Sequence, residues 1–388
     1  MSEAKQMHCD LMNMLLPILP RSVFGDIRRV ANLVWAIVGL CLTQTIRLEA
    51  WSEIIESRAK YAASRVRRFA RFLHNSAIDP KEWYTPLIQS VLKDWPSNTK
   101  LYIALDTTAL TPFVLIRISL IYRGRAIPLA WRAIRFPSTK VSFAEYQPVL
   151  DQVYALLPEG MVVTLLADRG FVQAELLRYA RDHNWHIRLR LTGNTIVHLP
   201  YRAPCQVREL CPPLGHASFF QNVALLGIAL APLHLALALP QEQLDDPWYV
   251  VSDEPTDLQT FDEYGLRFDI EETFLDEKSG GFQLESSELT TPDAIERLVL
   301  ILAIATIYFT SIGLGVVKAN VRRFVDTHWD RGLSYLKIGW RWLRQCYRRG
   351  WQVSTSFLLD PAPKSVPVTP SRQTAPLMKR QWIVSLLC

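Results

Sequence analysis

Short apolar runs, separated by turn residues and amphipathic stretches, dominate the middle of the chain between residues 99 and 192. Five of these runs have the length and composition of buried strands, and they cover residues 101–105, 114–122, 126–131, 161–167 and 186–191. Two longer stretches have helical spacing, at residues 143–157 and 173–182. The predicted order is a three-stranded meander, a helix, a strand, a helix and a strand, which indicates a mixed α/β unit.

Two of the predicted strands end in an aspartate. Asp106 follows the run LYIAL, and Asp168 follows the run VVTLLA. An isolated aspartate at such a position is often only a turn or cap residue. The element order is nevertheless that of a ribonuclease H-like core, in which the first and fourth strands are parallel neighbours. We therefore expect the two carboxylates to converge on one pair of metal ions.

A third candidate acid lies in the segment FDEYGLRFDIEETFLDEKSGGF, residues 261–282. If this segment is one helix, a period of about 3.6 residues brings four side chains onto one side, namely Tyr264, Arg267, Glu271 and Lys278. A carboxylate flanked by cations suits a phosphodiester, because the acid can hold a divalent metal while the cations hold phosphates. The alternative is a salt-bridged amphipathic helix. We assign residues 261–290 to the core as the element that carries the third acid.

The region before the α/β unit, residues 1–98, has the pattern of an all-helical domain. Its segment SRAKYAASRVRRFARF, residues 57–72, combines basic with aromatic side chains. Such a helix suits a DNA groove, where cations bind phosphates, so we predict DNA binding by Arg65, Arg67 and Arg68. The alternative is a charged face that packs against a neighbouring domain.

Three further regions complete the predicted domain organisation. Residues 193–260 are rich in strand-forming residues and are predicted to be a β-rich insertion that interrupts the core between its second and third acids. Residues 291–352 are predicted to form a basic, helical C-terminal region. Residues 353–388 contain several prolines, and we expect a mostly disordered tail.

The uncharged run LVLILAIATIYFTSIGLGVV, residues 298–317, is long enough to cross a membrane. It is the one such run, two glycines interrupt its end, and Thr291, Pro292 and Asp293 precede it as a capping signal. These features favour a buried core helix, and we expect no membrane partner.

Composition and charge narrow the class of partner. The chain has 388 residues, 49% of them hydrophobic, which is enough for a large core in two or three domains. Its net charge is +6, with basic residues concentrated in residues 57–72 and 318–349. Nucleic acid is therefore the leading partner. The six cysteines lack the spacing of a disulfide framework, and no signal peptide is recognisable, so we expect a cytosolic protein.

With these residues in hand, the chain resembles a bacterial insertion-sequence transposase of the DDE class, in the group called the IS-four family, whose signature is Tyr-x2-Arg-x3-Glu-x6-Lys. Tyr264, Arg267, Glu271 and Lys278 match the signature at every spacing. The contexts LYIALDTTAL, with Asp106, and LLADRGF, with Asp168, are similar to those of the family. The resemblance covers about residues 100–315.

The resemblance implies a retroviral-integrase-like fold with two Mg²⁺ ions, for which Mn²⁺ can substitute, held by Asp106, Asp168 and Glu271. It implies an enzyme that cuts DNA at the inverted repeats of transposon ends and joins the freed 3′ ends to target DNA, through a hairpin intermediate and as a homodimer on DNA. Glu272 adjoins Glu271, but as a metal ligand it would be rotated by about 100° on the helix. The bacterial cytoplasm, at the nucleoid, is the implied location.

The resemblance also implies a role for Trp248, at the end of the predicted insertion. A tryptophan at this place in the family holds a base that is flipped out at the hairpin, and aromatic stacking would offset the cost of unstacking the DNA end. The alternative is a core tryptophan in a strand.

Two other functions remain open from sequence. One is a ribonuclease H-like nuclease that hydrolyses DNA without joining strands. The other is a catalytically inactive DNA-binding derivative, which the intact set of three acids argues against.

Overall fold

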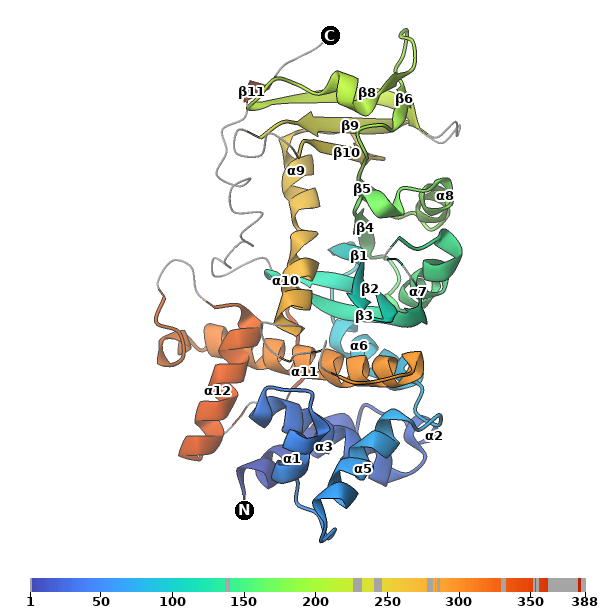
Figure 1. Ribbon diagram of the computed structural model, residues 1–388. Coiled ribbons are helices and arrows are strands. Elements are labelled where there is room, and N and C mark those ends of the chain that lie inside the picture. Colours follow the sequence, from blue (N-terminus) through green and yellow to red (C-terminus); the bar gives the residue numbers. More distant parts are fainter. Residues whose placement is uncertain are drawn as a thin grey trace.

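The computed structural model of the protein describes residues 2–136, 138, 140–225, 232–240, 246–277, 282, 284, 287–328, 333–351, 353, 356–361 and 383–384. The molecule is elongated, with the amino-terminal helices at one end and strands β8 and β9 at the other (Figure 1). Of the predicted tail, residues 362–382 and 385–388 lie outside the described residues.

The amino-terminal region is helical, as its pattern predicts. Its six helices are α1 (Glu3–Leu15), α2 (Arg21–Phe24), α3 (Ile27–Thr43), α4 (Leu48–Ile54), α5 (Ala62–Leu73) and α6 (Pro80–Leu92). Several begin at a side-chain cap, since Asp26 accepts a hydrogen bond from the backbone of Arg28, and Asp79 accepts from Lys81 and Glu82. Helix α3 is the apolar centre of the group and contacts α1, α4 and α5.

The predicted α/β unit forms half of a large mixed sheet. Its strands are β1 (Lys100–Leu110), β2 (Phe113–Tyr122), β3 (Arg125–Arg135), β4 (Val162–Ala167) and β5 (His186–Arg190), in the spatial order β3-β2-β1-β4-β5. Strands β1, β4 and β5 are parallel to one another, and β2 and β3 are antiparallel to their neighbours. The strand and helix order expected for this segment is confirmed.

One expectation for β1 is wrong. The strand does not end at Asp106 but continues to Leu110, because beyond Asp106 it still pairs with β2, from Thr107 opposite Ile116 to Leu110 opposite Phe113. What ends near Asp106 is the parallel pairing with β4, whose last partners are Leu105 and Ala167. Apolarity marks burial on both faces and does not mark the end of hydrogen bonding.

Residues 193–260 do not form a unit separate from the core sheet. Their strands are β6 (Ile196–His198), β7 (Cys205–Gln206), β8 (His216–Leu225), β9 (Leu233–Ala238) and β10 (Trp248–Ser252). Strand β10 pairs antiparallel with β5, and β9, β8, β6 and β7 follow in order, so the whole is one 11-stranded sheet in which β11 (Ile383–Val384) pairs with β8. The segment thereby covers the edge that β5 would otherwise expose.

Helices cover both faces of the sheet. Helices α7 (Phe143–Leu156) and α8 (Ala174–Asp182) lie on one side, and α9 (Leu258–Gly265) and α10 (Phe268–Glu277) form a column along the other (Figure 1). Helix α9 contacts β5, β9 and β10, whereas α10 contacts β1, β2 and β3. The column therefore crosses from one half of the sheet to the other.

This column is not the single helix predicted for residues 261–282. It breaks at Leu266 and Arg267, where the backbone N–H groups of Leu266, Arg267, Asp269 and Ile270 all bond to the carbonyl three residues earlier. The break arises from a tighter, 3₁₀-like turn, which hydrophobic spacing does not distinguish from an α-helix. Residues 278–281, near the end of the predicted segment, lie outside the described residues.

The uncharged run belongs to α11 (Pro292–Lys318), which is the one helix in the described part of the chain long and apolar enough to cross a membrane. Within this protein, 94% of its most apolar window is buried, and the helix contacts β3, α3, α5, α6 and α12 (Tyr335–Arg349). The contacts fit the predicted core helix. The predicted helical region 291–352 thus contains two long helices, α11 and α12, joined by a segment with a short 3₁₀ turn at Arg322–Phe324.

Helices α11 and α12 cross at two glycines. A Cβ atom added to Gly313 would collide with the backbone carbonyl oxygen of Tyr335, and one added to Gly339 would collide with that of Phe309. The two backbones therefore touch at this crossing, where any side chain would separate them. Gly315, in the same helix, has nothing within 4 Å of an added Cβ.

We predict that Gly313→Ala lowers the free energy of unfolding by about 1–3 kcal/mol through overpacking. Gly315→Ala is the matched control and should raise it by about 0.5–1 kcal/mol, because alanine has the higher helix propensity. Denaturant titration followed by circular dichroism measures both. Equal stability of the two variants would contradict the close crossing.

Candidate active site

Asp106 and Asp168 lie side by side because of the register between β1 and β4. Leu105 and Ala167 are the last paired residues of these parallel strands, and each aspartate is the next residue in its chain. Asp106 Oδ1 accepts the backbone N–H of Thr107 at 2.8 Å. Oδ1 of Asp168 is buried and has no hydrogen-bond partner in the described structure. A buried carboxylate oxygen without a partner is costly, and it is what a metal ligand looks like without its ion.

Glu271 reaches the same place from the first turn of α10, and Arg267 joins it to β1. Nη2 of Arg267 donates to Glu271 Oε1 at 2.6 Å, and Nη1 donates to Asp106 Oδ2 at 3.3 Å. Its Nε donates to the hydroxyl of Tyr264 at 3.1 Å, and the guanidinium lies 4.8 Å from the ring centre of Phe268. Three of the four signature residues thus form one bonded group with Asp106.

Burial decides the electrostatics of this group. Burial raises the pKa of Asp106 to about 6, opposed by Arg267 and by the N–H of Thr107, and assisted by Glu271 and Asp168. Burial alone would lower the pKa of Arg267, but Tyr264, Asp106 and Glu271 together raise it above its ordinary value. The guanidinium therefore stays charged next to the acids.

Arg267 is buried, whereas the sequence analysis predicted a cation that holds phosphates. The side chain is 4% exposed, and its three kinds of nitrogen each donate to a protein oxygen. Tyr264 is fully buried. Neither side chain faces a DNA surface in this conformation, so phosphate binding by them requires a rearrangement. Lys278, the fourth signature residue, lies outside the described residues.

The donor set fits a hard divalent cation, since three carboxylates from three elements supply oxygen ligands. Asp106 and Asp168 adjoin, and Arg267 links Asp106 to Glu271. Within the described residues the three acids do not form a group whose oxygens all lie within 4.8 Å of one another.

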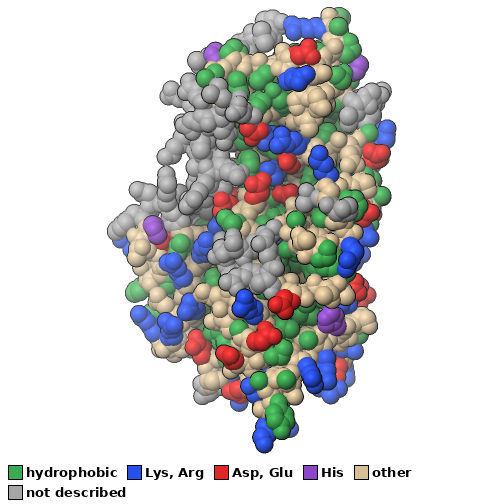
Figure 2. All heavy atoms as spheres, in the orientation of Figure 1, with side chains coloured by type: hydrophobic (Ala, Val, Ile, Leu, Met, Phe, Trp, Pro, Cys, Tyr) green, Lys and Arg blue, Asp and Glu red, His purple; other side chains and the backbone are tan. Residues whose placement is uncertain are grey.

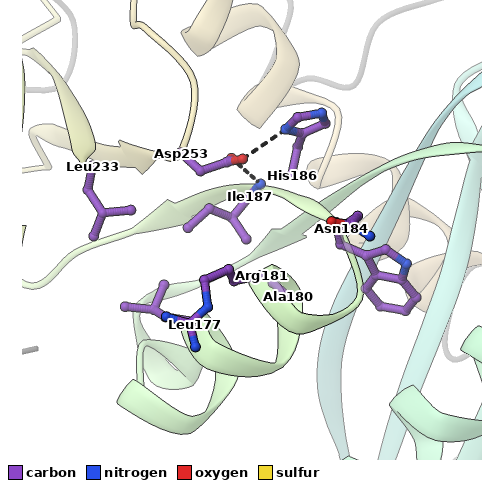
Figure 3. Close-up of a pocket in the computed structure, with 9 residues that line it drawn as sticks. Leu177, Ala180, Arg181, Asn184, His186, Ile187, Leu233 and Asp253 are labelled. Atoms are coloured by element: carbon purple, nitrogen blue, oxygen red, sulfur yellow. Dashed lines mark hydrogen bonds and ion pairs between the residues drawn. The ribbon is translucent and has the colours of Figure 1, made fainter. Parts of the chain in front are cut away.

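A second cluster, His186, Asp253 and Glu254, has ligand atoms that all lie within 4.8 Å of one another. It lies at the other end of the parallel strands. His186 Nδ1 lies 2.8 Å from Asp253 Oδ2 and 3.7 Å from Glu254 Oε2, beside a pocket that also includes residues of α8 (Figure 3). Asp253 already accepts the N–H of Ile187, and Glu254 pairs with Arg188. These carboxylates have partners and do not require an ion.

Trp248 begins β10 and is 2% exposed. Its ring centre lies 5.3 Å from that of Tyr264, 5.8 Å from that of Phe268 and 6.4 Å from that of Phe261. The structure therefore supports the packing alternative, and stacking on an extruded base would require Trp248 to leave this aromatic cluster. The sequence left both alternatives open, because strand-forming residues around a tryptophan do not tell which face of the strand a helix covers.

The three arginines of α5 have different surroundings. Arg65 Nε donates to Ser52 O at 3.0 Å, and Arg68 Nε donates to Asn32 Oδ1 at 2.5 Å, so both attach α5 to neighbouring helices. Arg67 is exposed, as is Arg71 one turn later. Arg65 and Arg68 thus fit the packing alternative, while Arg67 remains on the surface.

Sequence reasoning missed two ionic groups that hold the helix column. Arg117 of β2, 0% exposed, donates from Nη1 to both oxygens of Glu277 in α10, at 2.8 and 2.6 Å. Glu263 of α9 receives Lys100 Nζ at 2.8 Å and Arg188 Nε at 2.8 Å. The sequence does contain a sign of the first group, because Arg117 interrupts the apolar run FVLIRISLIY and a charge inside a buried strand needs a partner.

Comparison with known proteins agrees with this geometry. Residues 146–308 match the family described as the transposase DDE domain, and this range includes Asp168 and Glu271. The match supports a DDE transposase. No curated protein matches the chain. Among solved structures, one similar chain is from a piggyBac transposase synaptic complex with hairpin DNA, at 13% identity and a TM-score of 0.40, covering 95% of this chain and 85% of that one.

For Trp248 we predict a structural role. Trp248→Ala should lower the free energy of unfolding by about 3–5 kcal/mol, since it leaves a cavity among aromatic rings. Tyr201→Ala is the control, because Tyr201 is fully exposed and surface changes stay within about 0.5 kcal/mol. Urea unfolding followed by fluorescence measures both, and a Trp248→Ala protein as stable as the control would rule out the packing role.

Proposed function

We propose that this protein is a DNA transposase of the IS-four type, which cleaves transposon ends and joins them to target DNA by two-metal-ion phosphoryl transfer at Asp106, Asp168 and Glu271. In this proposal the chain contains a ribonuclease H-like core built on strands β1 to β5. The observation that carries the proposal is the convergence of the three acids, through the β1–β4 register and the Arg267 bonds to Asp106 and Glu271. The transposase DDE match over residues 146–308 supports it independently.

The proposed ions are two Mg²⁺, for which Mn²⁺ can substitute. When bound, such ions lower the pKa of an attacking water or 3′-hydroxyl and stabilise the leaving oxygen. The protein's part is to hold the three carboxylates on β1, the end of β4 and α10, and to keep them partly shielded from water. The side chains of Asp106 and Glu271 are 16% and 37% exposed, so substrate can reach Glu271 more freely than Asp106.

The proposed partner is DNA, at transposon-end inverted repeats and at the target, with a homodimer on the DNA and a hairpin intermediate. Two basic surfaces support DNA binding. One is the exposed part of α5 and the loop before it, with Arg58, Lys60, Arg67 and Arg71. The other is the α12 region, where Lys and Arg side chains gather on the lower left of the molecule (Figure 2). We further propose that the protein acts in the bacterial cytoplasm, at the nucleoid.

The first test removes each acid in turn. We expect Asp106→Asn, Asp168→Asn and Glu271→Gln each to reduce strand cleavage by at least about 10³-fold, because each loses a ligand of the ions that stabilise the developing charge. Glu272→Gln is the matched control and should cleave at near the parent rate. The assay is cleavage of a labelled transposon-end duplex with Mg²⁺. If Glu272→Gln is inactive and Glu271→Gln is active, the third ligand is Glu272 and not Glu271.

The second test separates DNA contacts from packing in α5. Replacing Arg67 and Arg71 together by alanine should reduce the slope of log affinity against log salt by about 1.8, since each phosphate contact contributes about 0.9. Arg65→Ala with Arg68→Ala should instead lower the unfolding temperature, because these side chains bond Ser52 and Asn32. Fluorescence anisotropy across a salt series gives the slope. An unchanged slope for the Arg67 and Arg71 variant would assign α5 wholly to packing.

A further inference from the structure

Arg267 lies where a cation is needed in the protein without metal. Its guanidinium is buried and bonds Asp106 and Glu271 at the same time. The Asp106 side chain is 16% exposed and that of Glu271 is 37% exposed, and two carboxylates that share one partner repel each other. The positive charge of Arg267 opposes this repulsion, so the arginine stabilises the two acids where they lie.

The position of Arg267 is fixed by three other features. The residue lies in the tight turn between α9 and α10, so a short segment of backbone sets its origin. The Tyr264 hydroxyl accepts its Nε hydrogen, and the Phe268 ring lies beside the guanidinium. A guanidinium does not lose its proton in proteins. Its charge therefore leaves the acids only if the side chain moves.

We propose that Arg267 is the resident counter-ion of Asp106 and Glu271, which holds the two carboxylates together before any divalent cation binds and competes with that cation for them. The inference rests on the proposed function, because it concerns the same three acids. The competition is local. Nη1 and Nη2 bond Asp106 Oδ2 and Glu271 Oε1, while the buried Asp168 Oδ1 has no partner in the described structure. An ion would thus displace Arg267 from Asp106 and Glu271 but no described group from Asp168 Oδ1.

The test compares stability and metal binding of the full chain. Arg267→Met removes the charge and keeps most of the side-chain volume. We expect a lower unfolding temperature in a chelator, a larger rise on adding Mg²⁺ than in the parent protein, and Mn²⁺ binding about tenfold tighter or more, since a buried like charge a few ångströms away is removed. Free Mn²⁺ is counted by electron paramagnetic resonance.

The matched control is Arg297→Met. Arg297 is buried to a similar degree, at 6% exposed, and donates to the backbone carbonyls of Ile78 and Leu73 away from the three acids. It should lower the unfolding temperature and leave Mn²⁺ affinity unchanged. Arg267→Lys keeps the charge and should bind Mn²⁺ like the parent. If Arg267→Met does not fold, Arg267→Gln, which retains hydrogen-bond donors without charge, replaces it in the same assays.

The outcomes separate the inference from the proposed function. Equal or weaker Mn²⁺ binding by Arg267→Met, with Asp168→Asn also weakened, would overturn the counter-ion role while the metal site stands. Arg267 would then orient the ligands for the ion. If Asp168→Asn, Arg267→Met and the parent all bind Mn²⁺ alike, the ion is not held at this site, and the proposed function and the inference fall together.

Discussion

Buried ion pairs attach the column of α9 and α10 to the sheet, and the position of Glu271 depends on them. Glu263 bonds Lys100 and Arg188 near one end, Arg267 bonds Asp106 at the break, and Arg117 bonds Glu277 at the far end of α10. Apolar burial alone would let a helix slide across a flat sheet, because it is not directional. Ion pairs that are largely shielded from water resist such sliding of the helix. Separating the partners would leave an uncompensated buried charge, which costs about 3–5 kcal/mol. The attachment therefore fixes where the third carboxylate meets the other two.

The sheet supplies the matching constraint. The register of β1 against β4 makes Asp106 and Asp168 neighbours, and the register of β1 against β2 puts Arg117 opposite Asp106. A shift by one residue in either pairing would turn the side chains to the other face. The added strands β10, β9 and β8 also help to position the column, because Trp248 of β10 packs against Tyr264 and Phe268. The segment that the sequence indicates as an insertion thus forms the part of the sheet against which α9 packs.

Helix α11 connects this core to the amino-terminal helices. It contacts β3 on one side and α3, α5 and α6 on the other, and the Glu296 side chain accepts the backbone N–H of Ala133. Arg297, near its start, donates to the backbone carbonyls of Leu73, the last residue of α5, and Ile78. The basic surface of α5 is therefore joined to the core through an apolar helix and two buried hydrogen bonds.

The sequence by itself determined the strands and helices from residue 99 to 192 and the helical amino-terminal region, because period and composition report local burial and spacing. It also indicated Asp106, Asp168 and Glu271 as candidate acids from their places in those elements. It did not determine that β1 runs on to Leu110, that the column breaks at Arg267, or that β6 to β10 join the core sheet. Those features depend on partners distant in sequence: β2 continues the pairing of β1, and β5 offers its edge to β10. Tertiary structure also decided the surroundings of Trp248, Arg65, Arg68 and Arg267. Whether a side chain lies at the surface or in the core is known only once the element that covers it is known. For Arg267, the Phe268 ring and Glu271 come from α10, and Asp106 comes from β1.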